Sequence, residues 1–284
     1  MSVAQIVGLL VKACVLSTVF ALGLNTRWKD LTHLFSTPGL FLRSLLAMYV
    51  LTPLIAVVLA LAAPAPLTIK VAVLLMAISA GAPALPKKLL KLDANPQYVR
   101  SLSVTTTLLA IATVPLSLTA LGAFFGRDVS VDIGQVAAKI TLAYLAPLLA
   151  GMVVRSVALT LAERMAGPIL NIAGVTLLVL IVLIVATSFS AIVGVGLPGL
   201  ATIALMTSAS LAIGHVLGGP DPNDRTTLAV ACATRFPGIG LLIAAQNFPK
   251  TKPLPVVVVY VLISTLTVLP YWRWRKSQHA AQVA

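Results

Sequence analysis

Apolar runs long enough to cross a bilayer recur along the whole chain, separated by short stretches that contain proline, glycine and charged residues. A transmembrane helix needs about 20 consecutive, mostly apolar residues. Reading the runs against this punctuation predicts one polytopic membrane domain over residues 1–284, an all-α membrane protein with about nine spanning helices. The expected spans are 4–24, 38–62, 69–92, 98–124, 134–154, 168–194, 197–218, 225–247 and 254–272.

Composition supports a membrane environment. The chain is 59% hydrophobic, only 10% of its residues are charged, and its mean hydropathy is +1.05. Soluble domains carry roughly 25% charged residues. The net charge of +13 comes from basic residues scattered between apolar runs rather than from a basic, aromatic face, so nucleic acid is not an expected partner. Cys14 and Cys232 lie in apolar segments, and their spacing indicates neither a disulfide nor a metal site.

Basic residues also predict the orientation, because cytoplasmic loops of membrane proteins are rich in Lys and Arg. Sorting alternate loops gives twelve basic residues on one side: Arg27, Lys29, Lys87, Lys88, Lys91, Arg100, Arg155, Arg164, Arg225, Arg273, Arg275 and Lys276. The other side receives four: Lys70, Arg127, Lys250 and Lys252. We therefore expect a multi-pass protein of the inner (plasma) membrane, with its N-terminus outside and its C-terminus in the cytoplasm.

Two of the expected spans contain helix-breaking residues near their centres. The third reads MAISAGAPALPKKLLKL, with Gly81, Pro83 and Pro86, and the eighth reads AVACATRFPGIGLLIAAQNF, with Pro237 and Gly238. Proline removes an intrahelical donor and clashes with the preceding turn, so each run should split into two half-helices. Unwound backbone at membrane depth survives only where protein buries it or water lines it. The pattern predicts two discontinuous helices that cross near the bilayer centre; simple proline kinks are the alternative.

Positive charge accompanies both interruptions. Lys87 follows the first, and Arg235 lies in the middle of the eighth span, where a charge is costly and usually functional. Free amides at the N-terminus of a half-helix add partial positive charge. Together these groups favour a carboxylate ligand, although Lys87 also suits the cytoplasmic end of a shortened third span.

The segment from Ile213 to Phe248, with GHVLGGP and DRTTLAVACATRFPGIGLLIAAQNF, resembles the sodium/bile acid cotransporter family. The third and fourth spans resemble that family's first crossover element. The resemblance implies inverted repeats, core and panel domains, and transport of organic anions by alternating access. It places the core helices at 38–124 and 168–272 and the panel helices at 1–37 and 125–167. The chain is similar to the nine-span members, with its first span matching the family's second.

The resemblance also implies sodium sites, and this chain departs from them. Ser101 and Thr105, which lie on one helical face, match the family's sodium-binding hydroxyls. Lys87 stands where the family has an Asn, and Arg235 stands where it has a Gln. Three further positions lack the family's polar residues: Ala231 for an acidic residue, Phe236 for an Asn and Met48 for a Gln.

These features predict a secondary transporter of small organic anions that is independent of sodium, with Lys87 and Arg235 as built-in cations. A sodium-coupled symporter with divergent sites, and an efflux carrier or channel of the same superfamily, remain alternatives. The expected substrate-binding residues are Lys87, Arg235, Ala84, Phe236, Ser101, Thr105 and His215. The expected crossover backbone is formed by Gly81, Pro83, Pro86, Pro237 and Gly238.

Other expectations follow from chemistry. His215 is the one side chain within a predicted span that titrates near neutral pH, so it suits either proton coupling or a helix contact. Paired carboxylates, metal clusters and activated nucleophiles are not recognisable, so we expect no enzyme activity and no cofactor besides sodium itself as a possible ion. The expected partners are a small organic anion and the lipid bilayer. Substrate identity, the coupling (sodium, protons, anion exchange or none), direction and oligomeric state, a monomer included, stay open.

Overall fold

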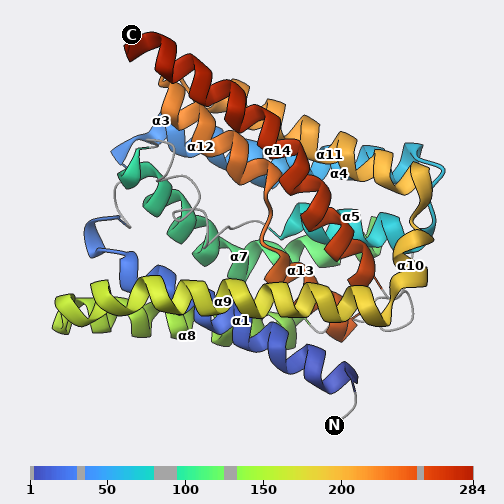
Figure 1. Ribbon diagram of the computed structural model, residues 1–284, viewed down its shortest axis with the longest axis horizontal. Coiled ribbons are helices and arrows are strands. Elements are labelled where there is room, and N and C mark those ends of the chain that lie inside the picture. Colours follow the sequence, from blue (N-terminus) through green and yellow to red (C-terminus); the bar gives the residue numbers. More distant parts are fainter. Residues whose placement is uncertain (1–2, 31–35, 80–94, 125–132, 248–252, 284) are drawn as a thin grey trace.

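The computed structural model describes residues 3–30, 36–79, 95–124, 133–247 and 253–283. Within these ranges the chain is helical and contains no strand (Figure 1). Its elements are α1 (Val3–Asn25), α3 (Pro38–Leu45), the π-helix η1 (Leu46–Leu51), α4 (Thr52–Ala62), α5 (Leu67–Ile78), α7 (Pro96–Phe124), α8 (Ile133–Val157), α9 (Leu159–Thr187), α10 (Phe189–Val193), α11 (Gly196–Leu217), α12 (Pro222–Ala233), α13 (Pro237–Asn247) and α14 (Leu254–Val283).

Eight apolar segments among the described residues are long enough to cross a membrane, and α5 is a shorter apolar helix. One segment combines α3, η1 and α4, and another combines α12 and α13. The predicted all-α membrane fold is therefore confirmed. The expected third span, 69–92, is described only as far as residue 79, so the count of nine spans stays a prediction.

The sixth span begins earlier than the sequence analysis expected. Its predicted range was 168–194, but α9 runs unbroken from Leu159 to Thr187 and passes through Pro168. Pro168 lies in an exposed part of this helix, and membrane helices tolerate a proline where the freed carbonyl finds other partners. The helix instead begins after Ala158, whose φ of −135° departs from the helical value.

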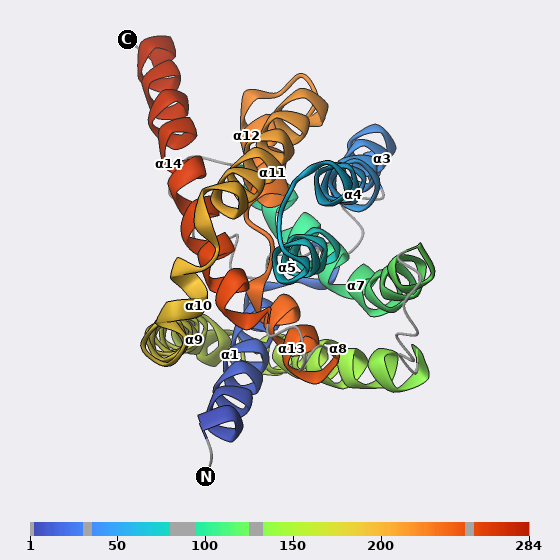
Figure 2. The ribbon, with the colours of Figure 1, turned by 90° about the vertical axis from the view of Figure 1, so that its right-hand side faces the viewer.

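Three helices form one layer of the bundle, which we call the three-helix layer: α1, α8 and α9. They pack mainly on one another and lie together at the bottom of both ribbon views (Figures 1 and 2). Gly23 of α1 and Gly151 of α8 face each other so closely that a Cβ on either would touch the partner's backbone. Small residues allow such close approach of membrane helices. The structure thus places α9 beside α1 and α8, although residues 168–194 were expected with the core; the division into core and panel stays a prediction.

The other helices form the second part of the bundle, with α11 packed on α12 and α14, and α4 packed on α5 and α11. Helix α7 contacts α8, and α13 contacts α1, so these two helices join the parts. Every residue from Thr226 to Ala233 in α12 is buried. The small side chains of Ala229, Ala231 and Ala233 let α12 occupy this crowded interior.

Candidate functional site

The eighth span is interrupted at its centre, as its sequence predicted. Helix α12 ends at Ala233 and α13 begins at Pro237, so residues 234–236 form a non-helical link. A proline suits the first position of a helix because its missing N–H would have no intrahelical partner there. The same proline disfavours helical backbone at the preceding Phe236. Gly238 allows close packing, since a Cβ there would lie 2.7 Å from Val15 Cγ2.

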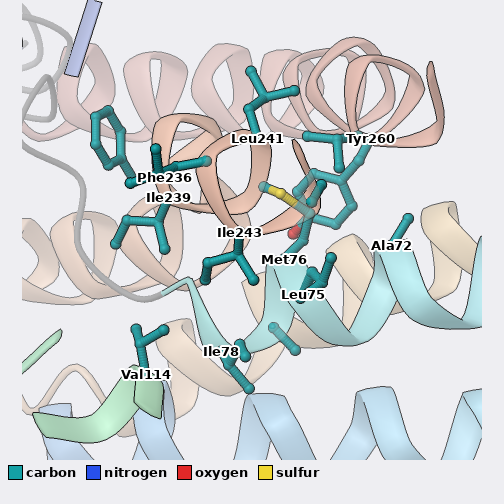
Figure 3. Packing of buried hydrophobic residues seen from close by; sticks show 14 of the residues in the cluster. Ala72, Leu75, Met76, Ile78, Val114, Phe236, Ile239, Leu241, Ile243 and Tyr260 are labelled. Atoms are coloured by element: carbon teal, nitrogen blue, oxygen red, sulfur yellow. The ribbon is translucent and has the colours of Figure 1, made fainter. Parts of the chain in front are cut away.

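The end of α5 meets this interruption directly. Helix α5 ends at Ile78, and the carbonyl of Ser79 accepts a hydrogen bond of 3.2 Å from the Phe236 amide. Figure 3 shows apolar side chains of α5 packed against the first turns of α13. The expected residues of the first interruption lie outside the described residues: Gly81, Pro83, Ala84, Pro86 and Lys87.

Arg235 occupies the link between α12 and α13, and only 3% of its surface is exposed. Its Nη2 donates a hydrogen bond of 2.8 Å to the carbonyl of Met48. Its Nε and Nη1 have no hydrogen-bond partner in the described part of the chain. The ion pairs found there join other residues, Arg100 with Asp30 and Arg155 with Glu163. The site therefore holds a buried guanidinium whose charge is not balanced by a described carboxylate.

The Met48 carbonyl is available because η1 departs from the α-helical register. The Thr52 amide, which would bond Met48 in an α-helix, donates to Ala47 instead. The next residue, Pro53, has no N–H to offer. Single π-turns of this kind are frequent at functional sites. The sequence analysis missed this feature, and its only signal was a proline inside the second span.

The other neighbours of Arg235 are neutral. Tyr49, Tyr260 and Cys232 lie within electrostatic range of the guanidinium. Both tyrosine hydroxyls donate their protons to backbone carbonyls: Tyr49 to Thr106 at 2.9 Å and Tyr260 to Ala233 at 3.2 Å. These groups place polar atoms near Arg235 but supply no compensating negative charge.

Phe236 joins the interruption to the three-helix layer. It is 5% exposed, and its ring meets the edge of Tyr144 on α8 with the ring centroids 6.1 Å apart. The Tyr144 hydroxyl is buried and has no hydrogen-bond partner among the described residues. The sequence analysis did not single out Tyr144, since a tyrosine within an apolar span gives no distinctive signal. Two consecutive residues of the link thus contact different parts of the bundle, Arg235 the π-helix and Phe236 the three-helix layer.

Ser101 and Thr105 lie on the buried face of α7. The Ser101 hydroxyl donates a hydrogen bond of 2.6 Å to the carbonyl of Asp30, which follows α1. The Asp30 carboxylate accepts from the Arg27 amide and pairs with Arg100 at 3.4 Å. Ser101 therefore helps to fasten the connection after α1 to α7.

His215 lies near the C-terminal end of α11, in an aromatic contact with α14. Its Nδ1 is 2.8 Å from the Tyr271 hydroxyl, and its ring meets Tyr271 edge-on. Trp274 adds a second ring contact, with centroids 5.6 Å apart. The structure thus gives His215 the helix-to-helix contact that the sequence analysis named as the alternative to proton coupling.

The described chain contains eight apolar segments that are long enough to cross a membrane, and one of them is interrupted at a buried arginine. These features define a polytopic membrane protein of the kind that builds binding sites from discontinuous helices. The sequence profile of the Sodium Bile acid symporter family matches residues 13–195, about two thirds of the chain. The chain belongs to this family and is a multi-pass membrane transporter of the bile acid symporter type. A comparison with curated proteins gives no match. The matched region ends before α12, so Arg235 lies beyond it.

Among the described residues around Arg235, few oxygens suit a sodium ion. Unwound backbone carbonyls coordinate sodium in transporters of discontinuous helices. Here the Met48 carbonyl is bonded to the guanidinium, and the side chains of Met48 and Ala231 carry no oxygen. A fixed positive charge also repels a second cation. Ser101 and Thr105 keep oxygens that suit a cation, but Lys87, expected beside them, lies outside the described residues.

Proposed function

We propose that this protein is a secondary transporter of small organic anions that works by alternating access without sodium. The observation that carries the proposal is the buried guanidinium of Arg235, with two nitrogens free of described partners, at the interruption between α12 and α13. Ionisable residues at membrane depth usually mark substrate or ion pathways. Discontinuous helices mark the same pathways in secondary transporters.

A carboxylate is the ligand chemistry that this environment favours. An uncompensated buried charge costs several kcal/mol, and a bound carboxylate removes that cost while accepting hydrogen bonds from the guanidinium. The N-terminus of α13, with its free amides, adds to the positive potential. Phe236 supplies an apolar neighbour for the rest of the molecule, so we favour a compact keto or hydroxy acid. Lys87 would provide the second positive charge.

Sodium independence follows from the permanence of the arginine charge. In a sodium symporter, the bound ion supplies positive charge together with the substrate, whereas Arg235 supplies it from the chain. The alternative of a sodium-coupled symporter with divergent sites is less favoured, because Ala231 and Met48 offer no side-chain oxygens. We further propose that the N-terminus faces the outside and the C-terminus the cytoplasm, from the distribution of Lys and Arg.

A thermal-unfolding assay of the purified protein tests the binding role of Arg235. Pyruvate, lactate, 2-oxoisovalerate and chloride are added to the wild type, to Arg235→Gln and to the exposed control Arg164→Gln. Carboxylates should raise the unfolding temperature of the wild type and the control, since a ligand at 100 times its Kd stabilises by about 2.7 kcal/mol. Equal stabilisation of Arg235→Gln would remove Arg235 from the site.

Uptake into proteoliposomes tests sodium independence. The wild type should transport radiolabelled carboxylate at the same rate with and without an inward sodium gradient. The triple variant Ala231→Glu, Arg235→Gln and Met48→Gln restores the polar residues that the resemblance implies, so it should gain sodium dependence. Strong sodium stimulation of the wild type would refute the proposal.

A further inference from the structure

We propose that this transporter is an exchanger, which carries one organic anion inward for each that it carries outward. The inference rests on the proposed function, because it requires Arg235 to bind the transported anion. It adds the coupling: the driving force for one anion is the gradient of another. The observation behind it is a cation that is fixed to the chain, 3% exposed and without an acidic partner among the described residues.

A fixed charge and a bound sodium ion differ in what leaves the site after transport. In a sodium symporter, both substrate and sodium dissociate, so the unloaded carrier returns without the added charge. Arg235 cannot dissociate. When an anion leaves, the guanidinium keeps its charge, and its neighbours Tyr49, Tyr260 and Cys232 are neutral.

The fixed charge of Arg235 should slow the return of the unloaded carrier. Alternating access passes through an arrangement in which the site is closed to both sides and water is largely excluded. Such closure penalises an uncompensated buried charge but not a guanidinium paired with a carboxylate. Because Met48 satisfies one nitrogen of Arg235 and Nε and Nη1 have no partner among the described residues, this part of the protein does little to offset the penalty. The loaded carrier should therefore reorient at least tenfold faster than the unloaded one.

Exchange also fixes how much net charge crosses the membrane in each cycle. A monocarboxylate bound to Arg235 makes the pair neutral, and exchange of one monoanion for another moves no net charge. Exchange should therefore not respond to the membrane potential. Transport without a counter-anion would move net charge in each cycle and should respond.

The experiment uses the full-length protein in proteoliposomes. Uptake of radiolabelled pyruvate, lactate or 2-oxoisovalerate is measured with the same unlabelled compound inside, or with buffer alone inside, and protein-free liposomes give the background. We expect the internal anion to raise the initial rate at least tenfold. A valinomycin-induced potassium potential should leave the exchange rate unchanged.

Two variants separate charge from folding. Arg235→Lys keeps the positive charge and should keep a clear stimulation by internal anion, whereas Arg235→Gln should lower uptake to the background of protein-free liposomes under both conditions. Arg164→Gln, on the exposed surface of α9, should match the wild type. If Arg235→Gln does not fold, the preloading and potential experiments on the wild type still decide.

The outcomes distinguish the two proposals. Uptake that is equally fast with and without internal anion would overturn exchange and leave the proposed function intact. Uptake of none of the three carboxylates under either condition would overturn the proposed function, and exchange with it.

Discussion

The broken span and the sixth span are opposite solutions to placing a helix in a membrane. In the broken span, Pro222–Ala244, 89% of the most apolar stretch is buried inside the protein, against 17% in α9. Yet α9 is the more apolar of the two, with a run of Leu, Ile and Val along its second half. Lipid is an apolar solvent, so α9, which faces lipid, can be the more hydrophobic helix. The buried broken span keeps small and polar side chains.

The two spans also treat proline differently. Helix α9 continues through Pro168, whereas the eighth span unwinds before Pro237. Around Pro237 a neighbouring segment helps to hold the unwound backbone, since the Phe236 amide donates a hydrogen bond to the carbonyl of Ser79 at the end of α5. The comparison shows that a proline permits a break, and neighbouring helices decide whether one forms.

The largest expected effect comes from a glycine of α11 that packs on the broken span, compared with a glycine within α9. A Cβ on Gly214 of α11 would lie 2.5 Å from the Ala229 Cα of α12, and backbone atoms cannot rotate away. Gly214→Ala should therefore destabilise the protein by about 3 kcal/mol, measured by thermal unfolding in detergent. The control Gly174→Ala, where the new methyl group meets open space among the described residues, should be nearly neutral. Equal effects of both changes would contradict the close packing of α11 and α12.

A smaller effect is expected from the proline that frees the Met48 carbonyl. Pro53→Ala restores an N–H that competes with Arg235 for this carbonyl, so the guanidinium loses its anchor. A hydrogen bond from a charged group contributes about 1.5–3 kcal/mol, and the competing amide should remove part of it, so carboxylate affinity should fall about fivefold. Isothermal titration with 2-oxoisovalerate measures this change, and Pro168→Ala in α9 serves as the matched control. Unchanged affinity in Pro53→Ala would show that the bond to Met48 does not position Arg235.

The smallest effect should separate two equally buried tyrosines. Tyr98 packs near α12 and its hydroxyl shares a hydrogen bond of 2.9 Å with Ser44, whereas the Tyr144 hydroxyl in the three-helix layer has no partner in the described chain. Tyr98→Phe should cost roughly 0.5–1.5 kcal/mol, and Tyr144→Phe should be neutral or stabilising. Thermal unfolding compares the two variants. A clear loss of stability in Tyr144→Phe would show that its hydroxyl is paired in the membrane-embedded protein.

The sequence by itself determined the features that depend on local chemistry. Runs of apolar residues located the spans, because hydropathy and length suffice to predict a crossing helix. Pro237 predicted the interruption, since a missing N–H is a covalent property of the residue, and Arg235 stood out as a charge within an apolar run. The family resemblance was likewise carried by local motifs, and the profile match confirms the family.

Only the tertiary structure decided which of these residues meet. Arg235 reaches the carbonyl of Met48, 187 positions away, and Ser101 reaches Asp30, 71 positions away. Only in the structure is it evident that α9 continues without a break past Pro168 and that His215 contacts α14. Such contacts depend on how separate helices pack, on which carbonyls lose their helical donors and on which faces meet lipid. A periodic pattern along one chain carries little of that information, because it records the preference of each segment and not its neighbours.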